Sequence, residues 1–503
     1  WMELRHLTDS DIKSQRTPNC DQETTISNKA SQSAWADRLT EVLQNAEDTE
    51  RKLSYGSSCG SERARKLTGS YYTPIDVSRY FWNEFFQLRG IEEPVAAEHF
   101  LKAHIFVEPS VGAGALFFSL LEKFVAIGLH PSGLSSIRAD LVDVNAQALD
   151  FVKAQITRLE NCGDFSFPHI NYVHSDFLAC NYNQASSPLM IFGNPPFVAN
   201  EKGASPWKNS FADFLDRSLN IAGTTGSIHL IVPLSVAFSR DYTALRSALI
   251  TDKRAIALSH FDNIPDTLFK SGKPKHDNTN KANSQRCTII SSIPSPKTRV
   301  LSTKLNRWSK KLRPEMLSAP AQYYDVTDHI FDEQIPRPQN ETIFHYLQEA
   351  AHGPGTINDH LSREGRYALH IAGVARNYIG IREDAGSSVN TLSFSSKDDF
   401  LRILSIVTSD LFLDYWLTIG DGFHITRTNI LNFPIHEHLL EGIDTTLSSA
   451  AKLWKARKRY VKYKLNSGMK TQSYDFSGAI QSFYPMVDRL ICQSEHGRTG
   501  TGV

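Results

Sequence analysis

An apolar run that ends at two consecutive prolines constrains this chain more than any other stretch. The run covers residues 189–193 and is followed by Asn194, Pro195, Pro196 and Phe197. Proline has no backbone N–H to donate and restricts the residue before it, so a strand over the run must end here in a stiff loop. The loop presents one amide side chain, two carbonyl groups and one aromatic ring. These groups together can hold a planar amino group and stack on its ring.

The length and composition predict a globular protein with several domains. At 503 residues the chain is long enough for two or three domains, and its hydrophobic content of 41% is sufficient for a sizeable core. No apolar stretch approaches the roughly 18 residues of a membrane span, and the first residues lack the apolar segment of a signal peptide. The formal net charge is zero, so a nucleic-acid partner would have to be bound by clustered basic residues.

The cysteines and the first residues carry no sign of a metal or nuclease site. The six cysteines are scattered, without CxxC spacing and without a cluster of Cys and His. We therefore expect reduced thiols, a cytoplasmic protein and no metal. Residues 1–66 are polar apart from one amphipathic stretch near residues 33–45. That stretch predicts a surface arm or linker with one helix, too short to hold the acidic residues of a nuclease.

A glycine-rich turn upstream of the apolar run predicts a ligand-binding loop. Residues 105–108 have strand character and lead through Pro109, Gly112 and Gly114 into a helical pattern. Glycines allow positive φ and close approach of the backbone to a ligand, and the helix N-terminus faces whatever lies above the strand. Glu108 at the strand end would repel a phosphate, so a cationic or zwitterionic ligand fits this loop better.

Acidic residues follow the next two predicted strands. Asp143 lies in a strand expected over residues 139–145, and Asp176 follows a strand expected over 170–174. A carboxylate at the end of the second strand commonly accepts the ribose hydroxyls of a nucleoside in doubly wound sheets. The two acids therefore predict a site for a nucleoside-containing ligand.

Strand and helix alternate from residue 105 to about residue 260, which predicts an α/β fold with a mostly parallel, Rossmann-like sheet. Later strands are expected over 189–193, 227–233, 255–261 and 287–293, and helices over 146–159, 207–221 and 242–249. Because no helix separates the last two strands, the last one is expected to run antiparallel. Upstream, Thr73 as N-cap and Pro74 at the first helical position predict the start of another helix.

Basic residues are concentrated in three segments of the second half of the chain. These are a loop over residues 269–286, a run over 297–313 that contains Trp308, and a helix expected over 447–465. If such segments bind phosphates, affinity should fall steeply with salt. After residue 294 the alternation of strands and helices stops, which predicts a separate domain of mixed α+β structure.

The order of these motifs is more informative than any one of them. Tyr72-Thr73-Pro74 opens a helix, the turn 108–114 follows, acids come after the next two strands, and Asn194–Phe197 follows the fourth. This order resembles the gamma class of DNA adenine-N6 methyltransferases, in which a target-recognition domain follows an S-adenosylmethionine-dependent catalytic domain. The resemblance covers residues 68–293, and residues 429–435 are similar to the end of that family's recognition domains. The domains it implies are an N-terminal arm over 1–66, the methyltransferase domain over 67–295, the target-recognition domain over 296–440 and a basic helical tail over 441–503.

The resemblance also implies roles for single residues. The S-adenosylmethionine site would comprise Tyr72, Thr73, Glu108, Pro109, Gly112, Gly114, Asp143, Asp176 and Phe177. Asp143 would accept the ribose hydroxyls and Asp176 the adenine amino group, with Phe177 against the adenine ring. Asn145 departs from the family, which often has an aspartate there. The catalytic residues that hold the target base would be Asn194, Pro195, Pro196 and Phe197. DNA contacts are expected from Phe269, as a second aromatic at the target base, and from Lys273, Lys275, Arg307, Lys310 and Lys311.

The function implied by this resemblance is sequence-specific transfer of a methyl group to N6 of an adenine flipped out of double-stranded DNA. The setting would be a restriction-modification or phage-defence system in the cytoplasm of a bacterial or archaeal cell, with any restriction or defence subunit on another polypeptide. Two alternatives remain open. One is methylation of RNA or of protein glutamine by the same loop, although such enzymes usually lack a large C-terminal domain. The other is a DNA-recognition subunit that is active only within a larger complex.

Overall fold

The computed structural model describes residues 33–49, 73–163, 165–182, 185–251, 253–269, 285–330, 333–350, 355–375, 377–386, 388–466, 469–477 and 479. The predicted site residues Tyr72, Lys273 and Lys275 lie outside these ranges. Among the described residues, no helix is both long enough and apolar enough to cross a membrane.

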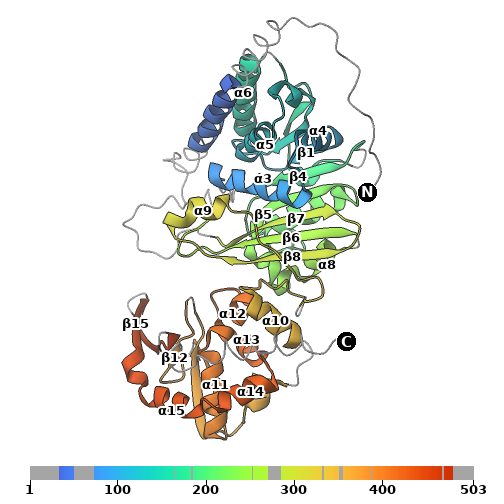
Figure 1. Ribbon diagram of the computed structural model, residues 1–503. Coiled ribbons are helices and arrows are strands. Elements are labelled where there is room, and N and C mark those ends of the chain that lie inside the picture. The colour runs from blue at the N-terminus through green and yellow to red at the C-terminus, as the bar shows by residue number, and fades with distance from the viewer. Residues whose placement is uncertain are drawn as a thin grey trace, which may run out of the picture.

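A nine-stranded sheet forms the centre of the first part of the described chain (Figure 1). Its strands are β1 (Ile105–Glu108), β2 (Arg138–Asp143), β3 (Ile170–His174), β4 (Leu189–Gly193), β5 (Ser227–Pro233), β6 (Arg254–Phe261), β7 (Cys287–Pro294), β8 (Arg299–Asn306) and β9 (Tyr324–Asp325). They lie in the order β3-β2-β1-β4-β5-β7-β6-β8-β9, and the first five are mutually parallel. The α/β fold with a large, mostly parallel sheet is therefore confirmed.

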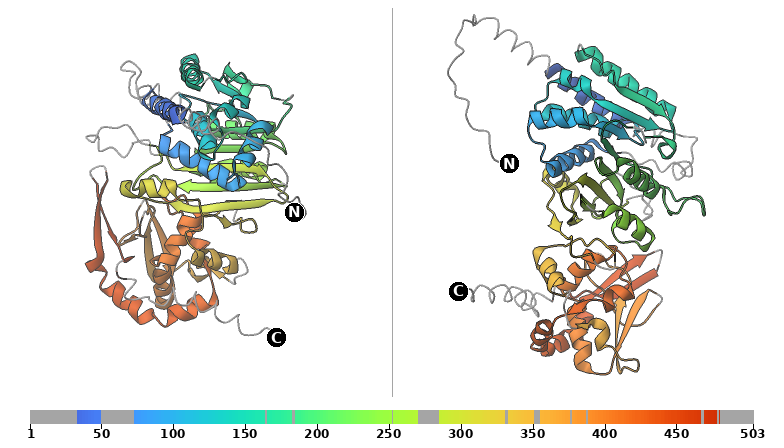
Figure 2. Two further views of the ribbon diagram at one scale, coloured as in Figure 1. Left: turned by 45° about the horizontal axis from the view of Figure 1, so that its top comes forward. Right: turned by 90° about the vertical axis from the view of Figure 1, so that its right-hand side faces the viewer.

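Helices cover both faces of this sheet. They are α3 (Ile75–Arg89), α4 (Pro94–Ala103), α5 (Ala115–Ala126), α6 (Ala146–Gly163), α7 (Ser210–Ala222), α8 (Thr243–Leu249) and α9 (Arg313–Ser318). Figure 2 shows α3 on one side of the strands and α7 and α8 on the other. Every residue of β4 and of β5 is buried as a result, which explains why the sequence of β4 is a continuous apolar run.

Short 3-10 helices connect several of these elements and of those in the C-terminal part. They are η1 (Pro131–Ser136), η2 (Phe177–Ala179), η3 (Leu234–Ala237), η4 (Arg240–Tyr242), η5 (Lys310–Leu312), η6 (Ile357–His360) and η7 (Arg457–Tyr460).

The amphipathic helix expected near residues 33–45 exists, but it is not a surface arm. Residues 33–49 are helical, and Trp35, Leu39 and Val42 are buried in the same core as the sheet. Figure 1 shows this helix beside α6. The sequence pattern predicted the apolar stripe of this helix, and the stripe is buried because it packs against α6.

The sheet does not end at the strand over residues 287–293. β7 runs antiparallel between β5 and β6, and the sheet continues beyond β6 with β8, parallel to β6, and β9. β8 lies inside the segment interpreted as a basic run past the catalytic domain. Val300, Ser302, Thr303 and Leu305 of this strand are buried, whereas the side chains of Arg299 and Lys304 are exposed, so the strand packs while these cations remain in solvent.

The C-terminal part contributes most of a second hydrophobic core, from Ile343 onward, to which Leu234 and Leu305 of the first part also belong. The buried residues of the first core extend to Ile335. The helices of the C-terminal part are α10 (Glu341–Ala350), α11 (Lys397–Val407), α12 (Asp410–Ile419), α13 (Arg427–Leu431), α14 (Glu437–Asp444) and α15 (Leu447–Lys455). Its strands are β10 (Gly355–Thr356), β11 (Tyr367–Ala372), β12 (Ile381–Arg382), β13 (Val389–Phe394), β14 (Pro434–Ile435), β15 (Val461–Asn466) and β16 (Met469–Tyr474). The change of core therefore lies near residue 340, past the expected boundary at 295.

The basic segment expected as one helix over residues 447–465 has two structures. α15 ends at Lys455, and β15 pairs with β16 as a hairpin that joins the five-stranded sheet β13-β11-β12-β16-β15. Val461 and Tyr463 favour a strand because β-branched and aromatic side chains suit the pleated backbone. Residues 441–466 and 469–474 are consequently part of the C-terminal fold and not a separate helical tail.

Candidate active site

The ends of three parallel strands bring three predicted residues to one edge of the sheet. Glu108 is the last residue of β1, Asp143 is the last of β2, and Asn194 follows β4. β1 pairs with β2 on one side and with β4 on the other. In open α/β sheets, ligands bind outside the carboxyl ends of the strands at such a reversal of strand order. This edge is the candidate site.

The glycine-rich turn after β1 is held by the carboxylate at the end of β2. Gly112 donates its N–H to Asp143 Oδ2 at 2.9 Å, and Asn145 donates its N–H to Asp143 Oδ1 at 2.8 Å. Gly114 has φ +82°, and a Cβ there would lie 2.8 Å from the ring of Phe118, so this turn requires glycine. A carboxylate has about four acceptor positions, so Asp143 can brace the turn and still accept a ligand hydroxyl.

The residues after β3 have structural roles of their own. Asp176 is exposed and caps η2 by accepting the N–H of Leu178 at 2.9 Å. The ring of Phe177 is buried and stacks on Phe214 of α7 with the ring centroids 5.5 Å apart. The structure places Asp176 at the same edge as Asp143, since β3 is parallel to β2 and adjacent to it.

Asn194 meets Thr73, and this contact revises the prediction that Thr73 caps a helix. Asn194 Nδ2 donates to Thr73 Oγ1 at 3.1 Å. The N-cap of α3 is Pro74, with no side-chain cap, because the Thr73 hydroxyl faces Asn194 instead. A Cβ at Gly193 would lie 3.2 Å from Pro109 Cδ, so the residue before Asn194 allows the turn after β1 to come close. Two predicted motifs far apart in sequence therefore adjoin each other.

Aromatic rings gather beside the Asn194 loop. Phe197 has its ring centroid 6.5 Å from that of Phe269 and 6.4 Å from that of Phe211, both edge to face. The Pro196 carbonyl accepts the hydroxyl of Ser210 at 2.6 Å, and the same hydroxyl accepts the N–H of Val198. The loop is thus anchored at the start of α7, and the structure brings together the two aromatic residues expected at a target base.

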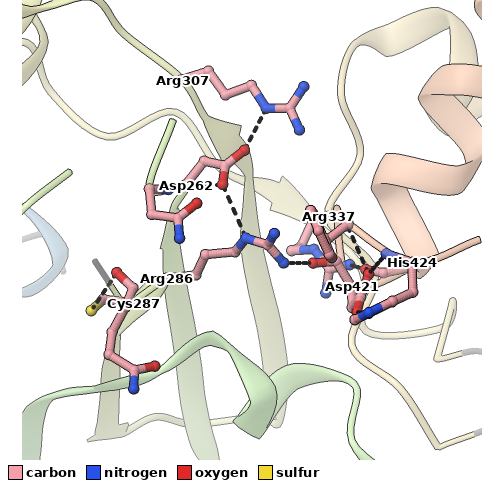
Figure 3. Close-up of polar contacts among 11 residues, drawn as sticks. Asp262, Arg286, Cys287, Arg307, Arg337, Asp421 and His424 are labelled. Carbon is pink, nitrogen blue, oxygen red and sulfur yellow. Dashed lines mark hydrogen bonds and ion pairs between the residues drawn. The ribbon is translucent and has the colours of Figure 1, made fainter. Parts of the chain in front are cut away.

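The predicted basic contacts fall into two groups. Lys310 and Lys311 are exposed in η5. Arg307 instead joins an internal ion-pair cluster, in which Asp262 accepts Arg307 Nε at 2.6 Å and Arg286 Nε at 3.1 Å (Figure 3). The Asp262 side chain is only 3% exposed, so Arg307 and Arg286 together balance a buried charge.

The same cluster joins the two parts of the chain. Arg286 donates to the Asp421 carbonyl, and Arg337 donates to the Gly420 carbonyl (Figure 3). Beside them lies a cavity of about 630 Å³. Its walls combine apolar and polar side chains, among them Phe238, Arg240, Gln334, Tyr415, His424, Asn429 and Asn432. The sequence did not point to Asp262, and it placed Arg286 only among the basic residues of the loop over 269–286. The two meet because Asp262 directly follows β6 and Arg286 directly precedes β7, which pairs with β6.

A buried carboxyl group lies on α3, the helix that follows Thr73. Burial raises the pKa of Glu84 from 4.5 to about 7, and hydrogen bonds from Tyr323 and Ser259 oppose this rise. The Tyr323 hydroxyl donates to Glu84 Oε1. Nothing in the sequence indicated that Glu84 is buried, because a glutamate on a helix is usually exposed.

Comparisons with known proteins add little to this geometry. No family model and no curated protein sequence matches the chain. Among solved structures, the chain is similar to the DNA complex of DrdV, with 11% identity and a TM-score of 0.46 over 84% of this chain and 65% of that one. It is also similar to the type IIL restriction-modification enzyme MmeI in complex with DNA, with 12% identity and a TM-score of 0.44 over 84% of this chain and 74% of that one. A type I restriction-modification methyltransferase subunit from Streptococcus thermophilus has 16% identity and a TM-score of 0.34, over 51% of this chain and 55% of that one. At these scores the likenesses carry no weight for the function, which has to rest on the site itself.

Proposed function

We propose that this chain is a DNA methyltransferase that transfers a methyl group from S-adenosylmethionine to N6 of an adenine. The observation that carries the proposal is the meeting of the Asn194 loop with Thr73 and with the turn after β1 at one sheet edge. An amide and carbonyl groups for an amino group then lie next to a turn suited to a nucleoside ligand. The order of these motifs in the sequence supports the same function.

The residues at this edge fit S-adenosylmethionine better than a phosphate-bearing cofactor. Glu108, Asp143 and Asp176 place three acids around the turn, which favours a ligand that carries positive charge and hydroxyl groups. Asp143 would accept ribose hydroxyls while it braces Gly112. When bound, S-adenosylmethionine supplies a methyl group on a sulfonium centre, which is an activated leaving group.

The residues of the loop would make the adenine amino group reactive. Its nitrogen is a poor nucleophile because the lone pair is delocalised into the ring. Asn194 Oδ1 and the Pro195 carbonyl can each accept one of its N–H groups, which favours tetrahedral geometry at the nitrogen and frees the lone pair. Such acceptors also stabilise the positive charge that develops during transfer. Fixed orientation of the reacting groups can contribute roughly 7–11 kcal/mol to lowering the barrier.

A base within a duplex is out of reach of this loop, so the target adenine would have to leave the helix, at a cost of a few kcal/mol. Stacking on Phe197, with Phe269 beside it, would return about 1–3 kcal/mol by analogy with single-stranded binding. Exposed Lys310 and Lys311 of η5, and exposed Lys452, Lys455 and Lys462 of α15 and β15, would contact phosphates. The partner would be double-stranded DNA.

The substrate class separates this proposal from its alternatives. The chain is incubated with tritiated S-adenosylmethionine and with genomic DNA, total RNA and ribosomal protein in separate reactions, and the labelled products are digested. We expect label in N6-methyladenine from DNA. Label confined to RNA or to protein glutamine would refute the proposal. Transfer to DNA that appears only after a partner polypeptide is added would favour the alternative of a subunit within a larger complex.

A further inference from the structure

One guanidinium group connects the two segments that flank the Asn194 loop. The Arg313 side chain, from the first turn of α9, is 8% exposed. Its Nε and Nη2 donate to the two carboxylate oxygens of Asp76 at 2.6 and 3.1 Å. Its Nη1 donates to the Thr267 carbonyl at 2.6 Å, and Nη2 also donates to the Leu268 carbonyl at 2.9 Å.

The acceptors of Arg313 lie next to residues of the candidate site. Asp76 is in the first turn of α3, three residues after Thr73, whose hydroxyl accepts a hydrogen bond from Asn194. Leu268 directly precedes Phe269, whose ring meets that of Phe197. These contacts form a continuous series. Asn194 binds Thr73 just before α3, and Asp76 of α3 binds Arg313. Arg313 in turn binds the carbonyl next to Phe269, whose ring meets that of Phe197 in the Asn194 loop.

We propose that Arg313 is a positioning residue that fixes Phe269 and Thr73 at once on the two sides of the Asn194 loop. This inference rests on the proposed function for its meaning, since it assigns Phe269 to the pocket of the target base. The planar guanidinium is needed because its fork of donors binds a carboxylate with two bonds and still reaches two carbonyl groups. A lysine carries the same charge but is a point donor and cannot span these acceptors.

A neighbouring contact limits the movement of the same segment without replacing Arg313. Trp308 Nε1 donates to Asp266 Oδ2 at 3.1 Å, and that carboxylate lies 3.5 Å from Arg313 Nη1. Trp308 therefore holds residue 266, whereas the carbonyls next to Phe269 depend on Arg313. Loss of the guanidinium should free the end of the segment that carries the aromatic ring.

The test compares Arg313→Lys with Arg254→Lys. Arg254 is also buried and donates to backbone carbonyls, those of Gly223 and Gly226, but it lies at the start of β6, on the opposite edge of the sheet. The first readout is hydrogen exchange, which does not depend on activity. We expect faster exchange around residues 266–269 and around residue 76 in Arg313→Lys alone. Unchanged exchange in both segments would overturn the inference, whether or not the protein methylates DNA.

The second readout is single-turnover methyl transfer to a duplex that contains the methylated sequence, as mapped with the wild-type protein. A misplacement of about 1 Å can lower a rate about 100-fold. We expect Arg313→Lys to lose 10- to 100-fold in rate with the affinity for S-adenosylmethionine unchanged. Part of this loss should be recovered on a duplex whose target adenine faces an abasic position, because that base is already unpaired. Arg254→Lys should keep the wild-type rate, and an equal loss there would contradict a positioning role.

Asp76→Asn provides a second variant in case Arg313→Lys does not fold. The Asp76 side chain is 40% exposed, so an amide of the same shape is tolerated there. The substitution weakens the Asp76–Arg313 contact by changing the acceptor instead of the donor. We expect the same exchange pattern and partial recovery, with a smaller loss of rate. A wild-type rate and wild-type exchange in Asp76→Asn would overturn the inference. Failure of the wild type to methylate DNA would instead refute the proposed function.

Discussion

Glu84 makes the stability of the sheet domain depend on pH in a direction opposite to that of most carboxylates. Burial raises its pKa from 4.5 to about 7, so the folded state holds the proton more tightly than the unfolded state does. Between these two values the folded state binds more protons, and the free energy of unfolding therefore falls as pH rises. The stabilisation is fully present below pH 4.5 and is lost as pH rises to about 7.

The size of the effect follows from the shift. A difference of about 2.5 pKa units, at 1.36 kcal/mol for each unit, corresponds to roughly 3 kcal/mol above pH 7. Glu84→Gln removes this titration and keeps an oxygen that can accept the Tyr323 hydroxyl. We expect the variant to lie within about 1 kcal/mol of wild type at pH 5, where most of the stabilisation remains, and to be more stable than wild type by roughly 3 kcal/mol at pH 8.

Urea unfolding followed by tryptophan fluorescence at pH 5, 6, 7 and 8 measures this difference. Glu92→Gln, at an exposed glutamate just after α3, controls for the loss of one negative charge. The reasoning is refuted if the stability difference between Glu84→Gln and wild type is the same at pH 5 and pH 8. It is also refuted if Glu92→Gln shows an equal gain at pH 8.

Three further predictions concern the site. Asn194→Ala should reduce methyl transfer at least 100-fold, while its affinity for S-adenosylmethionine stays within a few-fold of wild type. The control Asn171→Ala, at an exposed asparagine of β3, should have no effect on either. Equal losses of transfer in both variants would contradict the assignment of Asn194. Asp143→Ala should weaken S-adenosylmethionine binding by calorimetry by about 10- to 100-fold, because hydrogen bonds to a charged group contribute roughly 1.5–3 kcal/mol, and unchanged affinity would remove Asp143 from the cofactor site. Lys310→Gln with Lys311→Gln should lower the slope of log affinity for DNA against log salt by about 2, close to one for each phosphate contact. The pair Lys102→Gln with Lys153→Gln, exposed on α4 and α6, should leave that slope unchanged.

The parts of the fold that sequence could predict are those set by local pattern. The strand before Asn194, the turn before Gly114 and the strand that ends at Asp143 each combine an apolar run with a stop signal. Their meeting at one edge follows from the parallel order of the strands. Local chemistry and topology therefore sufficed to predict that these residues meet at one edge of the sheet.

The rest depends on pairings that no local pattern records. β8 was not predicted because its exposed positions carry cations, which gave the segment the pattern of a basic run. The hairpin after α15 was not predicted because its lysines are equally common in helices. Arg313 belonged to a basic run and was not distinguished from Lys310 until α9 placed it against α3. Thr73 resembled a helix cap, and a partner 121 residues away in sequence takes its hydroxyl instead.

Methyl transfer to adenine in DNA at the Asn194 loop can be measured in living cells. The most direct test expresses the chain in a host that has no adenine methylation, digests the genomic DNA and quantifies N6-methyldeoxyadenosine by mass spectrometry. We expect N6-methyldeoxyadenosine with the wild-type chain and none with Asn194→Ala expressed at the same level. N6-methyldeoxyadenosine at equal levels with both proteins, or its absence with a folded wild-type protein that binds S-adenosylmethionine and DNA, would contradict the proposed function.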